Sequence, residues 1–150
     1  MAAALERYRS HVAAPVPFGS MSSPSRPSRS IRNHRDLVVW QRAMDLVAEV
    51  YRLTDRFPRE ERYGLVQQVK RAVVSIPSNI AEGHGRDHLG DYLRYLSVAK
   101  GSLMEVETQF TIAVRLRYLE QADVTKLFER TVQVGQLLAG LVRALKAHRS

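Results

Sequence analysis

The sequence contains no cysteine among its 150 residues. This absence excludes disulfides, thiolate metal sites, iron–sulfur ligation and a cysteine nucleophile. Long apolar runs are lacking too. The longest uninterrupted one, residues 137–142, is far shorter than the ~18 residues that a membrane-spanning helix needs. We therefore expect no membrane-spanning helix. A cytoplasmic location without a membrane partner is our further expectation.

Acidic residues are also scarce. The chain has 15 Asp and Glu against 23 Lys and Arg, which gives a formal net charge of +8. Such an excess favours association with a polyanion, either nucleic acid or an anionic membrane face, but it says nothing about the fold. The length fits one globular domain.

Residues 1–30 differ in composition from the rest of the chain. They hold four of the six prolines, a Ser/Arg-rich run over residues 20–30 and a single acid, Glu6. Such a segment cannot bury enough apolar surface to offset the entropy lost on ordering, so we expect a disordered tail. An organellar transit peptide would share this composition. However, Met21 offers a second start, which favours a plain tail or an over-extended reading frame.

The rest of the chain, residues 31–150, keeps 19 Lys and Arg against 14 Asp and Glu. Within it, apolar residues recur at spacings of three and four, which predicts four amphipathic helices over about residues 36–57, 59–82, 87–117 and 121–145. Asp36 and Asp87 are the expected N-caps of the first and third helices. Pro77 predicts a kink over residues 73–77 within one continuous second helix, because the apolar stripe stays in phase beyond it.

No segment alternates apolar and polar residues, so no strand is predicted. Connections of a few residues between successive helices force neighbouring helices to run antiparallel. The predicted fold is therefore all-α, an up-down-up-down antiparallel four-helix bundle over residues 31–150.

Signals for metal, cofactor or catalysis are weak. His84 and His88 stand four residues apart beside Asp87 and Asp91, but the glycines that flank His84 place it in a turn, off the helix face that such a pair requires. The Gly-His-Gly run lacks both the Rossmann and the Walker context. We expect no metal, no cofactor and no enzymatic activity, although a catalytic triad is a spatial arrangement that sequence does not display.

The second helix carries a polar row beside its apolar stripe. A solvated face is normally rich in Lys and Glu, whereas this row consists of shape-specific hydrogen-bonding groups, so it predicts a partly buried seam against another helix or subunit. Antiparallel pairing of the second and third helices makes Glu105 the expected carboxylate partner of Arg71. An ordinary polar flank is the alternative. The row consists of Gln68, Arg71, Ser75, Asn79 and Glu82.

The row falls within a longer pattern, whose most specific part is Ser-Ile-Pro-Ser-Asn-Ile-Ala-Glu-Gly at residues 75–83. Over about residues 35–120 the chain resembles the four-helix-bundle protein family encoded in intervening sequences of bacterial 23S ribosomal RNA. It is similar also to the accessory variability determinant of diversity-generating retroelements. The supporting residues are Leu37-Val38-Val39-Trp40-Gln41, Tyr51, Phe57-Pro58, Glu61, Leu65, Gln68, Arg71-Ala72, Tyr92, Leu96, Ala99, Ser102, Glu105, Glu107 and Thr108.

The resemblance implies a non-enzymatic bundle that assembles into a ring-like homopentamer. For the accessory determinant it also implies a basic surface presented to nucleic acid and to a reverse transcriptase. The motif residues largely coincide with the polar row, which suits a structural seam better than a ligand site. Residues 1–30 have no counterpart in this pattern.

Basic residues that can face a polyanion lie mainly on the second and third helices. They are diluted by Asp91, Glu107 and Glu129, and no RNA-recognition signature or aromatic stacking platform accompanies them. We therefore expect an oligomeric accessory factor that binds RNA or DNA without sequence specificity. A structural or adaptor bundle with a protein partner is the alternative. The candidate nucleic-acid-binding residues are Lys70, Arg86, Arg94, Lys100, Arg115 and Arg117.

Overall fold

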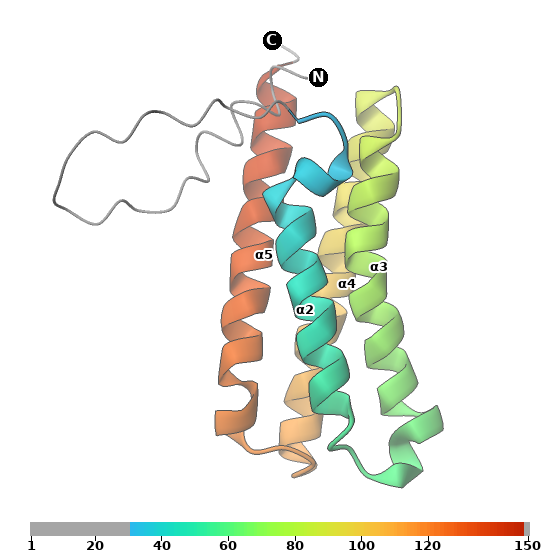
Figure 1. Ribbon diagram of the computed structural model, residues 1–150, viewed down its shortest axis with the longest axis vertical. Helices are drawn as coiled ribbons and strands as arrows, with labels where there is room; N and C mark the ends of the chain where they lie inside the picture. Colours follow the sequence, from blue (N-terminus) through green and yellow to red (C-terminus); the bar gives the residue numbers. More distant parts are fainter. Residues whose placement is uncertain (1–30, 149–150) are drawn as a thin grey trace, which may run out of the picture.

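The computed structural model describes residues 31–148, and the predicted tail over residues 1–30 lies outside them. The chain forms four α-helices, α2 (Val38–Thr54), α3 (Leu65–His84), α4 (Leu89–Arg115) and α5 (Gln121–Ala147), with two short 3-10 helices, η1 (His34–Asp36) and η2 (Arg59–Tyr63). Figure 1 shows the connections at alternate ends of the molecule, so successive helices run in opposite directions. Residues 31–148 contain no strand, and the predicted all-α four-helix bundle is confirmed.

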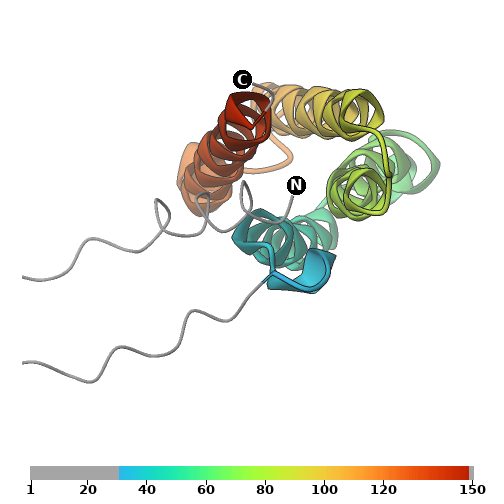
Figure 2. The same cartoon turned by 90° about the horizontal axis from the view of Figure 1, so that it is seen from above.

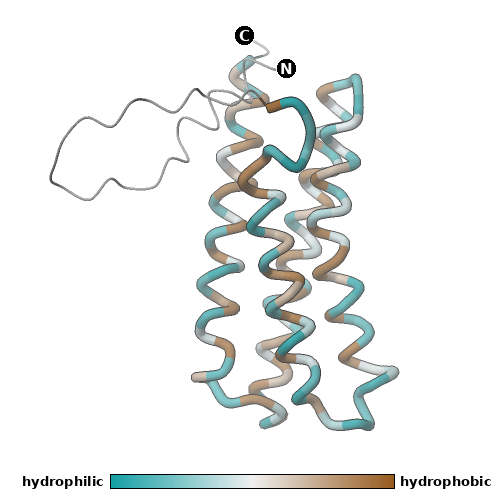
Figure 3. The backbone as a smooth tube through the Cα atoms, in the orientation of Figure 1, coloured by the Kyte–Doolittle hydropathy of each residue, from teal (hydrophilic) through white to brown (hydrophobic). Residues whose placement is uncertain are grey.

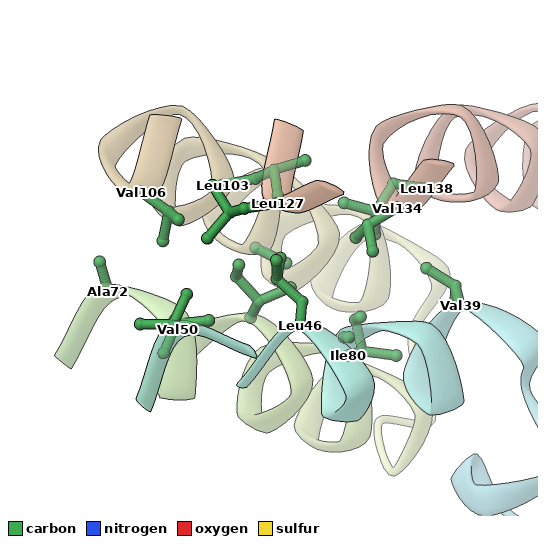
Figure 4. Close-up of a cluster of buried hydrophobic side chains, with 14 of the residues drawn as sticks. Val39, Leu46, Val50, Ala72, Ile80, Leu103, Val106, Leu127, Val134 and Leu138 are labelled. Carbon is green, nitrogen blue, oxygen red and sulfur yellow. The ribbon is translucent and has the colours of Figure 1, made fainter. Parts of the chain in front are cut away.

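Apolar side chains from all four helices fill the centre of the bundle. Leu46, Ile80, Leu103 and Leu127 come from α2, α3, α4 and α5, and each is almost completely buried; Figure 4 shows these side chains among the central cluster. Burying one such side chain is worth roughly 1.5–3 kcal/mol relative to exposing it. Figure 2, seen along the bundle, shows α2 between α3 and α5, with α4 on the far side. The hydropathy colours of Figure 3 alternate along each helix, as expected when one face is buried.

The start of α2 differs from the prediction. Asp36 is not the N-cap of α2, because it closes η1, where its Oδ2 accepts hydrogen bonds from the backbone N–H groups of Arg32 (2.9 Å) and Asn33 (3.2 Å). Leu37 is extended and buried, and α2 begins at Val38 and ends at Thr54. The prediction was wrong because a carboxylate can close a 3-10 turn as well as an α-helix.

The second helix starts later than predicted. Residues 59–64 were expected to belong to it but do not. They form η2 and a glycine break, and α3 begins at Leu65. Glu61 of η2 accepts a hydrogen bond from the backbone N–H of Leu65 (2.8 Å), which satisfies one of the free donors at the start of α3. From there α3 runs as a single helix through Pro77, as the in-phase apolar stripe predicts.

The two ends of α4 are built differently. His88, not Asp87, occupies the N-cap position, because the turn after Gly85 puts the extended backbone one residue later than predicted. At the other end Arg117 has φ 60°, and the N–H groups of Tyr118 and Arg117 donate to the carbonyls of Ala113 (2.9 Å) and Val114 (3.0 Å). This pair of bonds is the Schellman motif, in which the left-handed position usually holds glycine. α5 begins at Gln121, as predicted.

Candidate functional site

The middle of the polar row lies in the contact between α3 and α4, the most extensive helix pair of the bundle. Asn79 Nδ2 donates to the carbonyl oxygen (2.7 Å) and to Oγ (2.9 Å) of Ser75. Ser102 Oγ, from α4, donates to the same Ser75 Oγ (2.9 Å). Ser102 is buried and the other two are half-buried. The Ser102–Ser75 bond therefore joins the two helices, and the Asn79 bonds hold Ser75 in place within α3.

Two side chains of the block donate hydrogen bonds beside the carbonyl that Pro77 leaves without its helical partner. Proline has no N–H, so the carbonyl of Val73 loses its helical partner. Ser78 Oγ donates to the carbonyl of Val74 (2.8 Å), and Asn79 Nδ2 donates to that of Ser75, so the carbonyls next to the interrupted bond gain side-chain donors. The most specific part of the sequence pattern thus has a structural explanation.

The last turn of α3 packs tightly on two tyrosines of α4. Gly83 is buried, and a Cβ atom there would lie 2.8 Å from Tyr92 Cδ2 and 2.9 Å from Tyr95 Cβ, closer than real side chains approach. Tyr92 is fully buried, and burial raises the pKa of its hydroxyl far above the usual value. Its oxygen lies 3.5 Å from Nδ1 of the half-buried His84.

Glu82, Arg86, Arg94 and Tyr95 form an exposed polar cluster at this turn. Arg86 donates to the Glu82 carboxylate and to the Tyr95 hydroxyl (2.8 Å). Hydrogen bonds from Tyr95 and Arg86 hold the pKa of Glu82 below its usual value. Both guanidinium groups lie against the Tyr95 ring, at 4.9 Å for Arg86 and 4.8 Å for Arg94. Glu82 neutralises Arg86, whereas Arg94 forms no ion pair with the rest of residues 31–148.

The remaining members of the predicted seam are exposed. Gln68, Arg71 and Glu105 lie on the surface, and no hydrogen bond or ion pair joins Arg71 to Glu105 inside this subunit, so the predicted pair is not formed there. The physical reason is helical phase. Arg71 is four residues from Ser75, which turns it about 40° away from the side that faces α4.

The six predicted nucleic-acid-binding residues do not form one patch. Arg86 and Arg94 lie at the α3–α4 turn, whereas Arg115 and Arg117 lie at the opposite end of α4, roughly 32 Å away at 1.5 Å per residue. Lys70 lies on the α2 side of α3, with Nζ 4.5 Å from the centroid of the Tyr51 ring. The exposed Lys100 is near the middle of α4.

We next looked for a ligand pocket or a metal site within residues 31–148. A shallow hollow of about 390 Å³ on the outer face of α4 is lined by Glu107, Thr108, Thr111, Ile112 and Arg115. Both threonine hydroxyls donate to carbonyls of α4 itself (2.8 Å each). Residues 31–148 contain no group of three His, Asp or Glu placed to hold a metal, and none of their helices is long and apolar enough to cross a membrane.

A network at the end opposite the α3–α4 turn was missed by the sequence analysis. The Tyr118 hydroxyl donates to Glu61 Oε1 (2.9 Å), while Glu61 Oε2 accepts from the Leu65 N–H, and these bonds lower the pKa of Glu61. Phe57 packs on Tyr118 and on Phe110, with ring centroids 5.9 Å apart in both cases. Glu61 was in the sequence pattern, but its partner is 57 residues away in another connection, and no periodicity indicates that contact.

Comparisons with known proteins agree with this architecture. The chain is similar to the crystal structure of a protein of unknown function from the S23 ribosomal protein family of Bacteroides thetaiotaomicron, with a TM-score of 0.65 and 19% identity over 70% of this chain and 98% of that chain. At that identity the likeness concerns the fold. No curated protein matches the chain. A family model described as 23S rRNA-intervening sequence protein matches residues 35–140, from η1 into α5. The chain therefore belongs to the 23S rRNA-intervening sequence protein family.

Proposed function

We propose that the protein is a non-enzymatic, homo-oligomeric accessory factor of the cytoplasm that binds RNA or DNA without sequence specificity. The observation that carries the proposal is the excess of exposed cations that no acid neutralises. In residues 31–148 ion pairs involve only Arg42, Arg52, Arg56, Arg86 and Arg130. Arg94, Lys100, Arg115 and Arg117 are exposed and outside any ion pair. Such side chains are free to replace the counterions of a phosphate backbone.

The outer face of α4 supports the assembly. Val98, Met104 and Ile112 are 45%, 44% and 40% exposed there. Gly101, in the middle of the helix, has no atom within 4 Å of the position of a Cβ. An exposed glycine inside a helix costs about 1 kcal/mol relative to alanine, and no contact within the subunit offsets this cost. A second copy packed on α4 would use both features, and the family resemblance favours a pentamer.

In this proposal, nucleic acid binds to several subunits of the oligomer at once. A single subunit with scattered cations neutralises few phosphates and binds weakly, whereas several subunits that engage one strand or duplex raise the effective concentration. Gln68 and Arg71 of the polar row, and Glu105 of α4, are exposed and available for contacts between subunits. A reverse transcriptase is a further proposed partner, on the strength of the resemblance to the accessory determinant.

Light scattering and fluorescence anisotropy test the proposal together. We expect an oligomeric mass at micromolar concentration, and a logarithmic plot of affinity against salt with a slope of about −0.9 per duplex phosphate neutralised. Replacing Arg86, Arg94 and Lys100 together by Glu should abolish binding. The bundle should stay folded, because all three side chains are exposed. The matched control is Arg59→Glu, Arg62→Glu and Lys126→Glu, three exposed cations at the other end of the bundle.

A structural or adaptor bundle is the second candidate, because the exposed apolar side chains of α4 would equally suit a protein partner. A monomeric mass would defeat the assembly. If the wild-type protein shifts neither RNA nor DNA at low salt, or if the triple variant binds unchanged, the adaptor function replaces nucleic-acid binding.

A further inference from the structure

All four histidines of residues 31–148 lie at one end of the bundle. His34 is in η1, His84 ends α3, His88 precedes α4 and His148 follows α5. Figure 1 shows η1, the α3–α4 connection and the last turn of α5 at the same end of the molecule. We call this end, together with its charged residues, the histidine end. The opposite end, formed by η2 and the α4–α5 connection, has no histidine in the described range.

The fixed charges of the two ends are similar in number and in pairing. The histidine end has six cations against four acids, and only Arg86 among the six forms an ion pair with residues 31–148. The opposite end has seven cations, of which Arg52 and Arg56 are paired, against six acids. Its cations are Arg52, Arg56, Arg59, Arg62, Arg115, Arg117 and Lys126, and its acids are Glu49, Asp55, Glu60, Glu61, Glu120 and Asp123. The cations of the histidine end are Arg32, Arg35, Arg86, Arg94, Arg143 and Lys146, and its acids are Asp36, Glu82, Asp87 and Asp91.

Separation makes each end an independent electrostatic surface. The 27 residues of α4 span about 40 Å, several times the Debye length of roughly 8–10 Å at physiological salt. A phosphate bound at one end therefore senses the charge of that end alone.

Acidification changes only one of these surfaces. Histidine is the side chain whose ordinary pKa places its charge change between about pH 5 and 8. Six cations and four acids give the histidine end a formal +2, and each histidine that gains a proton adds one charge to it. The opposite end, with seven cations and six acids, stays at +1 over the same range.

The four histidines differ in what faces them. His84 packs edge-on against the Tyr92 ring and lies near His34 and Asp36 of η1; burial and the His34 charge lower its pKa, and Asp36 opposes them. His34 packs edge-on against Trp40, with ring centroids 5.3 Å apart.

His88 and His148 are exposed. In the sequence, His88 follows Arg86 and Asp87 and precedes Asp91, and His148 lies between Lys146 and Arg149. Protonating these two exposed rings buries no charge.

We infer that the histidine end is the surface that meets the phosphates of nucleic acid, and that it binds them more tightly as the pH falls. The inference rests on the proposed nucleic-acid binding and assigns it to one end of the bundle. The carrying observation is the gathering there of every histidine of residues 31–148 beside six cations, whereas the opposite end, with as many cations outside ion pairs of the described residues, has none.

The test uses a labelled DNA duplex of about 25 mixed base pairs, whose phosphates do not change charge between pH 8 and pH 6. Anisotropy titrations of the full chain at equal ionic strength should give about tenfold tighter binding at pH 6. The salt slope should steepen by about 0.9 for each extra phosphate neutralised. The triple variant His34→Gln, His88→Gln and His148→Gln should lose most of this pH dependence.

Matched charge reversals locate the surface. Arg32→Glu with Arg35→Glu, at η1, should weaken binding at least tenfold, whereas Arg59→Glu with Arg62→Glu, at η2, should change it less than about threefold. All four side chains are exposed. Arg143→Glu with Lys146→Glu, at the end of α5, tests the same surface from a second element should the η1 pair perturb folding.

The outcomes separate this inference from the proposed function. Wild-type binding that is equal at both pH values, full pH dependence in the glutamine variant, or equal losses from the η1 and η2 reversals would overturn the histidine end while leaving nucleic-acid binding intact. If the wild-type protein binds neither at pH 8 nor at pH 6 in low salt, the proposed function fails and this inference fails with it.

Discussion

A Cβ atom at position 83 would lie 2.8 Å from Cδ2 of Tyr92, so α4 leaves no room for a side chain at Gly83 of α3. The glycine ends the block at residues 75–83, and the tyrosine belongs to the supporting residues of the same sequence pattern. The two positions therefore have one steric explanation, because a large buried ring requires a residue without a side chain beside it.

Gly83→Ala should destabilise the bundle. Overpacking a buried contact costs typically 1–3 kcal/mol, against at most about 1 kcal/mol gained from helix propensity. We expect a net loss of about 1–2 kcal/mol in urea unfolding. Gly90→Ala is the control, because nothing lies within 4 Å of a Cβ at that position. Equal stabilities of the two variants would show that α4 moves aside without cost.

Arg117→Gly should stabilise the fold. Arg117 holds the left-handed position of the Schellman motif with φ 60°, which costs a residue with a side chain roughly 1–2 kcal/mol. Glycine removes that strain but adds freedom to the unfolded chain, so we expect a net gain of about 0.5–1 kcal/mol. Thermal unfolding measures it, with Arg115→Gly, inside α4, expected to lose stability. A less stable Arg117→Gly would mean that the arginine side chain makes a compensating contact.

The helices of the bundle were predictable because burial repeats with the helical period. Leu46, Ile80, Leu103 and Leu127 belong to the apolar rows that predicted the four helices, and all four are buried. The spacing did not find every core position, because Met44 and Tyr51 of the first helix share it and are each 42% exposed. The ends were not predictable to the residue. Aspartate is a common N-cap residue, but the conformation of the neighbouring turns puts Asp36 at the end of η1 and Asp87 one residue before the N-cap of α4.

The candidate site was predicted less well than the fold. Phase alone places Ser75 and Asn79 in a seam, and the structure finds them there. Whether Arg71 reaches Glu105 depends on a rotation of about 40°, which spacing cannot resolve. The gathering of the histidines at one end depends on which connections share an end, so it follows from topology and not from any local motif.

Glu61→Gln should lower stability in a pH-dependent way. The bonds from Leu65 and Tyr118 lower the pKa of Glu61 in the folded state. A carboxyl of this kind stabilises the fold above its unfolded pKa, near 4.3, and loses that contribution as the pH falls through the lowered folded value. The Tm difference between wild type and variant should therefore be largest at pH 7 and shrink below about pH 4.

The neighbouring exposed Glu60 provides the control for this prediction. Its side chain makes no hydrogen bond or ion pair within residues 31–148, so Glu60→Gln should leave Tm nearly unchanged at every pH. A difference for Glu61→Gln that stays constant down to pH 3 would show that shape, not charge, stabilises the end of the bundle at Tyr118.

Deleting residues 1–30 should leave the bundle intact. The segment is proline-rich and has no apolar periodicity, and the first helix of the described residues, η1, begins at His34. Circular dichroism should give the same helical signal per molecule, and Tm should change by less than a few degrees. Deleting residues 1–36 instead also removes η1 and should lower Tm, because Ile31 packs against the core. A comparable loss from the shorter deletion would show that the tail packs on the bundle.

Gly101→Arg should separate the stability of the subunit from the stability of the assembly. Nothing within the subunit lies within 4 Å of a Cβ at this position, and arginine favours a helix over glycine by about 0.5–1 kcal/mol, so the isolated bundle should become slightly more stable. If a second copy packs on the outer face of α4, a long charged side chain at Gly101 excludes it, and light scattering should show monomers. Gln67→Arg adds the same charge at an exposed position of α3 and should keep the wild-type mass. An oligomer that survives Gly101→Arg would move the subunit contact away from α4, and the exposed Val98, Met104 and Ile112 would then need a different partner.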